Sequence, residues 1–250
     1  MEITKNSVLL RLSFSKAGNE RKASLESVDT QADKKRLSLT KKLYTCKPYK
    51  DIGSFDAKLG EWIDSRAIPC NIGYRGIKLL PLELLAEVET RLNQAVVERR
   101  DLVTAFMQVY DAERQTAKIA MKEFFNANNY PASGVVADKF DMDWWYVTFK
   151  VPENLPAGLF KEQQEKLEAR FSDMEANVRT SLRLVMEKLM TTLADQLKEK
   201  NEQGKKRKFY DSSIQDLSEF LRLFSIRNVT KDEDLQKLAD AAEQIIAGAT

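Results

Sequence analysis

Apolar residues recur at three- and four-residue intervals along two long stretches of the chain, and this spacing predicts two long helices. The first apolar seam runs from Leu84 to Phe125, in a helix expected over 82–125, with Pro81 where a first-turn proline is tolerated. Unbroken, that helix would be about 66 Å long at the usual rise per residue. The second seam runs from Leu167 to Leu197 and follows two prolines that end the preceding segment.

A different pattern predicts two strands. Residues from Val8 to Phe14 alternate between apolar and polar, which is typical of a strand with one buried face. The run from Trp144 to Phe149 is apolar on both faces, so we expect a second strand, within 141–151, that is covered on both sides. We expect it to pair with the first strand.

The remaining segments are shorter. Residues 17–35 are polar and predict either a mobile loop or a cap for a basic helix from Lys34 to Leu43. Ser54 is a plausible N-cap of a short helix that ends at Ile68, before a proline. Two helices are expected near the C-terminus, the second opened by a capping box of Thr230 and Glu233.

These elements predict an α+β protein that is predominantly α. An isolated apolar seam needs a partner, so we expect the two long helices to form an antiparallel, coiled-coil-like hairpin over 81–200, with a small sheet at its base. Residues 1–80 hold the first strand and short helices, and residues 209–250 hold the C-terminal helical pair. Leu184, Met186 and Met190 lie off the main seam, and they predict contact with another subunit, hence a homo-oligomer, or with the C-terminal helices.

Composition narrows the chemistry. The chain has 250 residues with 40 basic and 38 acidic side chains, so no strong overall field attracts nucleic acid or an anionic membrane. It contains no histidine, which removes Ser–His and Cys–His catalysis and most catalytic zinc sites. Cys46 and Cys70 lack a CxxC spacing and indicate reduced thiols. No leader pattern or membrane-length apolar run occurs, so we expect a cytoplasmic protein of a bacterial cell, with no membrane association.

Two features were weighed as sites. Asp138, Asp141 and Asp143 include two carboxylates on one strand face that a metal ion could use, although acidic residues also mark a loop that leads into a strand. The turn Gly73–Gly76 could offer backbone amides to an anion, or simply connect two elements. The simpler alternative is preferred in both cases, so no catalytic residue, metal or cofactor is predicted. A carboxylate-dependent nuclease or hydrolase ranks third among the functional classes, after an adaptor and a nucleic-acid-binding protein.

A basic run carries the second functional hypothesis. Four consecutive cations are suited to phosphate contacts, and they are Lys205, Lys206, Arg207 and Lys208. Other basic residues could join them, namely Lys34, Lys35, Arg36, Lys41 and Lys42. A solvated linker is the simpler interpretation of the run, so nucleic-acid binding is the alternative function and not the favoured one.

The order of elements resembles a known family. An N-terminal strand, a turn leading into Leu79-Leu80-Pro81, a long helix, an aromatic strand ending at Phe149-Lys150-Val151-Pro152 and a second long helix are similar to a bacterial and phage family of unknown function. Its members are often encoded beside MoxR-type AAA+ ATPases and von Willebrand factor A proteins. The resemblance implies a non-enzymatic scaffold or adaptor, encoded by a phage or a bacterium, that partners such an ATPase, and it assigns no functional residue.

Overall fold

The computed structural model describes residues 2–26, 28–68, 76–197 and 221–247. The helices are α1 (Glu2–Asn6), α2 (Lys47–Arg66), α3 (Leu85–Met121), α4 (Ser133–Ala137), α5 (Ala157–Leu197) and α7 (Glu233–Ala247), and residues 221–227 are also helical. The strands are β1 (Ser7–Ser15), β2 (Glu20–Ala23), β3 (Leu39–Lys42), β4 (Ile77–Pro81) and β5 (Asp141–Val147). Short 3-10 turns occur at Lys34–Arg36, Leu82–Leu84, Lys122–Phe124 and Ala127–Asn129. The expected α+β class, predominantly α, is confirmed.

The chain divides into two compact units. Unit 1 comprises residues 1–11, 63–88 and 145–250, and unit 2 comprises residues 12–62 and 89–144. β1, α2, α3 and β5 contribute residues to both units, and each unit has a hydrophobic core of its own.

The sheet confirms the predicted strand pairing and adds a strand. Its order is β4-β1-β5, so the aromatic strand lies beside β1 as expected. β4 pairs antiparallel with β1, from Ser7 opposite Pro81 to Arg11 opposite Ile77. Gly76, at φ +76°, directly precedes this strand, which was not predicted from the sequence. The predicted cover over both faces of β5 is wrong, because Trp145 is 46% and Tyr146 42% exposed.

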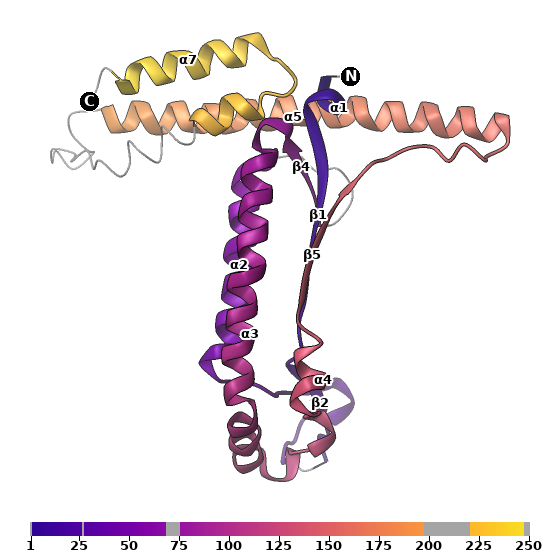
Figure 1. The fold of residues 1–250 in the computed structure, drawn as a ribbon, viewed down its shortest axis with the longest axis vertical. Coiled ribbons are helices and arrows are strands. Elements are labelled where there is room, and N and C mark those ends of the chain that lie inside the picture. The colour runs from indigo at the N-terminus through magenta and orange to yellow at the C-terminus, as the bar shows by residue number, and fades with distance from the viewer. Residues whose placement is uncertain (1, 27, 69–75, 198–220, 248–250) are drawn as a thin grey trace. The chain divides into compact units, whose positions relative to one another are not determined.

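Unit 2 is built on an antiparallel pair of helices, α2 and α3, which run side by side in Figure 1. Near one end of the pair, the rings of Tyr49 and Phe106 lie 5.2 Å apart between centroids. Farther along α2, the buried Arg99 of α3 donates from Nε to Asp56 Oδ1 at 2.7 Å. The first long helix therefore has α2 as its partner, a helix that the sequence predicted to be much shorter.

Helix α2 begins at Lys47, seven residues before the predicted N-cap Ser54. Pro48 lies in its first turn, where a missing N–H costs nothing. The carboxylate of Glu113, from α3, accepts the backbone N–H groups of Thr45 and Cys46 just before the helix. A distant side chain thus satisfies donors at the helix start, and no local pattern reveals it.

The predicted basic helix from Lys34 to Leu43 is also wrong. β2 and β3 form an antiparallel hairpin from Glu20 opposite Lys42 to Ala23 opposite Leu39. Only the single 3-10 turn Lys34–Arg36 is helical there, and the Asp33 side chain caps it by accepting the N–H of Lys35 at 3.0 Å. The capping signal was correct, but the apolar residues beyond it alternate along a strand.

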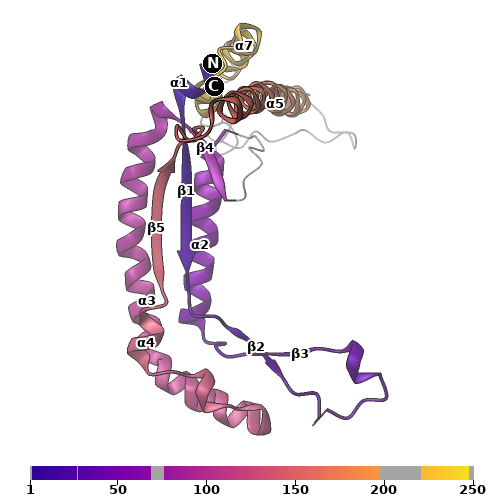
Figure 2. The ribbon, with the colours of Figure 1, turned by 90° about the vertical axis from the view of Figure 1, so that its right-hand side faces the viewer.

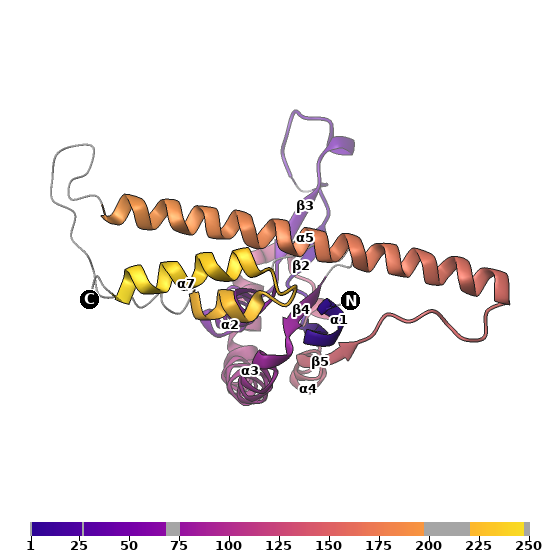
Figure 3. The same cartoon turned by 90° about the horizontal axis from the view of Figure 1, so that it is seen from above.

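Unit 1 buries the seam of the second long helix. Figure 3 shows α7 and residues 221–227 beside the C-terminal half of α5. One core contains the seam residues Met174, Val178 and Leu182, the neighbouring Met186, and residues of α7, of 221–227 and of the start of the chain. The second long helix is therefore confirmed, with its partner supplied by the predicted C-terminal helices.

The predicted pairing of the two long helices through their seams is wrong for the described residues. The seam of α3 is buried in an aromatic core with α2, whereas that of α5 is buried with α7. The expected capping box is replaced as well: Asp232 Oδ1 accepts the N–H of Leu235 at 3.2 Å and caps α7, while Thr230 lies two residues farther out.

Candidate functional site

The apolar seam of α5 extends beyond the helices that cover it. The seam residues Met174, Val178 and Leu182 are buried, but none of the residues from 157 to 173 is. Phe160, Leu167 and Phe171 continue the same stripe in a half-buried state. Figure 3 shows α7 beside the C-terminal half of α5 only, whereas Ile3 and Thr4 of α1 line a cavity that reaches Phe171. An amphipathic helix with an uncovered stripe is typical of a binding surface.

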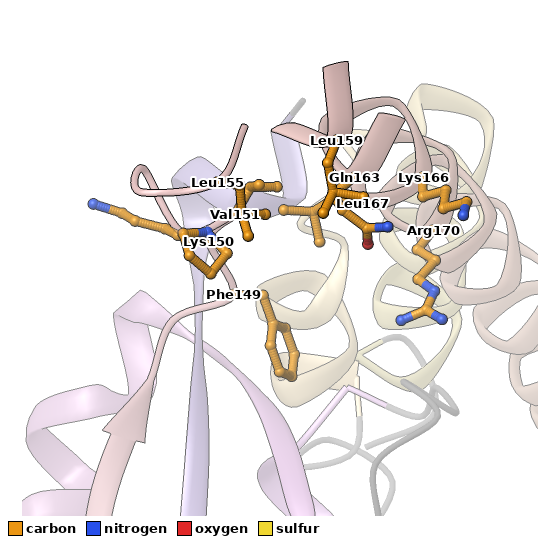
Figure 4. A pocket seen from close by; sticks show the side chains of 10 residues that line it. Phe149, Lys150, Val151, Leu155, Leu159, Gln163, Lys166, Leu167 and Arg170 are labelled. Carbon is orange, nitrogen blue, oxygen red and sulfur yellow. The ribbon is translucent and has the colours of Figure 1, made fainter. Parts of the chain in front are cut away.

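A cavity of about 400 Å³ lies at this open half, between α5 and the segment that follows β5. Figure 4 shows Val151 and Leu155 of that segment opposite Leu159 and Leu167 of the helix, with the Phe149 ring below them. Pro152 and Pro156 hold the segment away from a strand or helix conformation, so the chain passes over the stripe without closing it.

Cationic side chains border the apolar lining. Figure 4 shows Lys166 and Arg170 on one side of the apolar side chains and Lys150 on the other. None of the described residues that line the cavity is acidic, although Lys166 Nζ lies 2.5 Å from the Glu162 carboxylate one turn before it. An apolar centre with cations at its edges suits a ligand that is apolar with acidic flanks.

A second cavity of about 380 Å³ adjoins the first. Phe149 and Lys150 line both, and the second is completed by Phe171 and Met174 of α5 and by the start of the chain near Ile3. The accessible surface thus follows the α5 stripe toward the buried core. We call the two cavities together the α5 groove.

The β2–β3 hairpin of unit 2 is a second exposed surface. Figure 2 shows it extending away from α2 as a narrow ribbon. Lys34, Lys35, Arg36 and Lys42, all proposed above as phosphate contacts, are exposed there. Lys41 is only half-exposed, because its Nζ donates to the carbonyl oxygen of Phe124 at 2.5 Å.

Four tyrosines form a buried cluster in unit 2, and their hydroxyl groups have altered acidity. Tyr110 and Tyr130 donate to the carbonyl oxygens of Pro131 at 2.6 Å and Leu43 at 3.1 Å. Burial raises the pKa of Tyr130 to about 12, with further contributions from the charges of Glu113 and Tyr110. Burial also raises the pKa values of the whole set, Tyr44, Tyr49, Tyr110 and Tyr130, and that of the Cys46 thiol. These groups stay protonated and build the core.

The other residues weighed in the sequence are dispersed. Met186 is buried against the C-terminal helices, Met190 is partly buried on the same core, and Leu184 is 60% exposed. Asp141 and Asp143 are exposed, and among the described residues no group of three acidic, Cys or His side chains is arranged to hold a metal ion. The run Lys205–Lys208, Cys70 and residues 73–75 lie outside the described residues.

No family model, no curated protein and no solved structure is similar to this chain. The family resemblance therefore remains a prediction. No helix in the described part of the chain has both the length and the apolar character that crossing a membrane requires.

Sequence reasoning missed the α5 groove, although its signals were present. Leu159 and Arg170 lie on the same α5 face as Leu167, and Val151 and Leu155 are separated only by Pro152, Glu153 and Asn154. An apolar seam indicates an open groove where it extends beyond the helices that cover it. The sequence alone does not give the length of those covering helices, so the groove could not be inferred from it.

Proposed function

We propose that this protein is a non-enzymatic adaptor that binds an acidic, amphipathic segment of a partner protein in the α5 groove. The observation that supports this proposal best is the unburied stretch of α5 from 157 to 173, whose apolar stripe continues the seam that is buried at Met174, Val178 and Leu182. A partner segment would extend the cover that α7 provides farther along the helix.

The chemistry of the partner follows from the lining. Leu155, Leu159 and Leu167 offer apolar contact for large side chains, each worth about 1.5–3 kcal/mol when fully buried. Lys150 and Lys166 border this centre and favour carboxylates at the flanks of the bound segment. Two or three such anchors contribute about 3–9 kcal/mol before the cost of association is subtracted, so we expect weak binding, with a dissociation constant in the high-micromolar range.

The family resemblance suggests a partner to try first. An acidic, apolar segment of a MoxR-type AAA+ ATPase would fit the expected adaptor role. A second copy of this chain is another occupant, because Leu184 and the groove both leave apolar surface uncovered on α5.

A fluorescence-anisotropy titration tests the proposal. The probe is a labelled synthetic peptide of about 15 residues with leucines on one helical face and glutamates on the other. We expect high-micromolar binding to the full chain, weakened at least about tenfold by Leu167→Asp or Leu159→Asp, since one buried leucine anchor is lost and a carboxylate repels the peptide.

Leu184→Asp is the matched control. It places the same charge on an exposed leucine of the same helix, outside the lining of either cavity. This variant should bind the peptide as the wild type does. Equal weakening by all three substitutions, or no binding to the wild type at any concentration, would rule out the groove. Light scattering of the same samples reports whether a second copy occupies it instead.

A further inference from the structure

The basic character of the chain is concentrated in one segment. Residues 16–50 contain ten basic and four acidic side chains, and from Lys34 to Lys50 there are seven basic residues and no acidic one. The whole chain carries a formal charge of only +2, so the rest of it is acidic on balance. We propose that the β2–β3 hairpin is a nucleic-acid-binding arm that contacts the phosphate backbone, a role separate from that of the α5 groove.

The shape of the hairpin suits this ligand. It is a two-stranded antiparallel ribbon, and the major groove of B-DNA, at about 12 Å wide, admits such a ribbon. In the observed register, Lys22 and Lys42 share one face of the ribbon with Glu20 and Thr40, and all four residues are exposed. The opposite face is partly covered at Ala23, Leu39 and Lys41. The exposed face therefore carries the cations, and the covered face anchors the arm to unit 2.

The cations of the arm are little used within the protein. Arg36 lies 3.9 Å from Asp33 in an exposed pair that contributes little, and Lys34 donates only to the Glu26 carbonyl oxygen at 3.4 Å. Neither Lys35 nor Lys42 has an ion pair among the described residues.

Hydroxyl groups accompany the cations. Ser24, Ser38 and Thr40 are exposed along the ribbon and its loop, and serine and threonine are common partners of phosphate oxygens.

An acidic protein would need apolar contacts for stable binding, and an anionic membrane would need an inserted apolar cluster. Leu37 is the single large apolar side chain of the described part of the arm that is exposed. The combination favours nucleic acid.

The test measures binding of a labelled random-sequence DNA duplex to the full chain over a range of salt concentrations. Lys34, Lys35, Arg36 and Lys42 are replaced together by Gln. If these four residues contact phosphates, affinity at about 0.05 M salt falls at least tenfold, and the slope of log K against log salt becomes shallower by up to about 3.6, at about 0.9 per contact.

The matched control replaces four exposed basic residues elsewhere in unit 2, namely Lys58, Arg100, Lys118 and Lys139, by Gln. It removes the same charge and should change the slope by less than about 1. Equal effects of the two sets would show attraction by net charge alone and would refute the arm.

A third variant, with Lys205–Lys208 replaced by Gln, tests whether the other basic segment of the chain binds the DNA instead. Loss of binding in this variant alone would assign the interaction to that run and overturn the proposal. Absence of DNA and RNA binding by the wild type at low salt would also overturn it, as would preference for phosphatidylserine vesicles or for a polyglutamate peptide over the duplex. Acetylation footprinting gives a direct readout: Lys35 and Lys42 should be protected by bound DNA, and Lys118 should not.

Discussion

Replacing Glu113 by Gln tests how the root of the basic arm is held. Glu113 is 9% exposed, and one of its carboxylate oxygens accepts three hydrogen bonds. The donors are the N–H of Thr45, the N–H of Cys46 at 3.1 Å and the hydroxyl of Thr45 at 3.1 Å. Thr45 and Cys46 connect β3 to α2, so this single carboxylate fixes the end of the arm to α3.

The expected loss can be worked from these contacts. Hydrogen bonds to a charged group contribute about 1.5–3 kcal/mol net, against about 0.5–1.5 kcal/mol for neutral partners. The helix dipole stabilises a carboxylate beside the α2 N-terminus by about a further 0.3–1 kcal/mol. Because the three hydrogen bonds share one oxygen, the losses expected for the individual bonds when the charge is removed do not simply add. We expect Glu113→Gln to lower the free energy of unfolding by about 2 kcal/mol, and Glu113→Ala by about 4 kcal/mol, since Ala leaves two amides without an acceptor.

Two measurements check this prediction. Urea unfolding followed by circular dichroism gives the free energies, and hydrogen exchange of a peptide covering residues 43–50 should show faster exchange at Thr45 and Cys46 in both variants. Glu123→Gln, an exposed carboxylate on the same part of the chain, is the control and should change stability by less than about 0.5 kcal/mol. If Glu113→Gln is as stable as the wild type with unchanged exchange, the desolvation cost of the buried charge cancels its hydrogen bonds, and the reasoning fails.

Three further outcomes are expected. Met186→Ala should cost about 2–5 kcal/mol in urea unfolding, because it opens a cavity between α5 and the C-terminal helices, whereas Leu184→Ala on the exposed face should be nearly neutral. The pKa of Tyr130 in the folded protein is about 12, above its ordinary value of 10.0, so its contribution to stability is present below pH 10 and is lost as the pH rises toward 12. Ultraviolet titration should show this late ionisation. In Glu113→Gln the ionisation should occur at lower pH, because the charge of Glu113 contributes to the raised pKa. Burial opposes the charge of Asp232, but hydrogen bonds from Arg183 and Leu235 hold its pKa below 3.8. Asp232→Asn should therefore lower the free energy of unfolding by about 1 kcal/mol near neutral pH. This difference in stability between the variant and the wild type should vanish as the pH falls through the folded pKa of Asp232. Equal acid sensitivity of the two proteins would contradict this last expectation.

The class of fold and its longest elements were predictable because they depend on local periodicity. The apolar spacing from Leu84 to Phe125 requires a helix wherever its partner lies, and α3 with its flanking turns covers nearly the same range. The pairing of β1 with β5 was predicted for a related reason, since two apolar strands in one small protein have few other partners.

Helix partners were not predictable in this way. A seam shows that a face is buried but not by what, and the hairpin prediction assumed that α2 was too short to serve. Its first turns carry Tyr49 and Ile52, whose burial depends on Tyr44, Phe106 and Tyr110. This cluster joins residues more than fifty positions apart, and Glu113 satisfies the helix start from a similar distance.

The same limit applied to the candidate sites. The sequence identified Lys34, Lys35 and Arg36 as basic but predicted either a mobile loop or a helix there, because alternation over only four residues in β3 is a weak strand signal. The α5 groove depends on where the cover of the seam ends. That position is set by residues 221–247, which pack along only part of the helix.

A charge-swap experiment tests the central claim, capture of an acidic segment in the α5 groove, most directly. Lys150→Glu, Lys166→Glu and Arg170→Glu together reverse the charge on the two sides of the cavity. Anisotropy then compares the wild type and this variant with the leucine–glutamate peptide and a leucine–lysine counterpart. The account predicts that the wild type prefers the acidic peptide and the variant the basic one, with each preference about tenfold, or about 1.4 kcal/mol. The same preference in both proteins, or binding by neither, would contradict it.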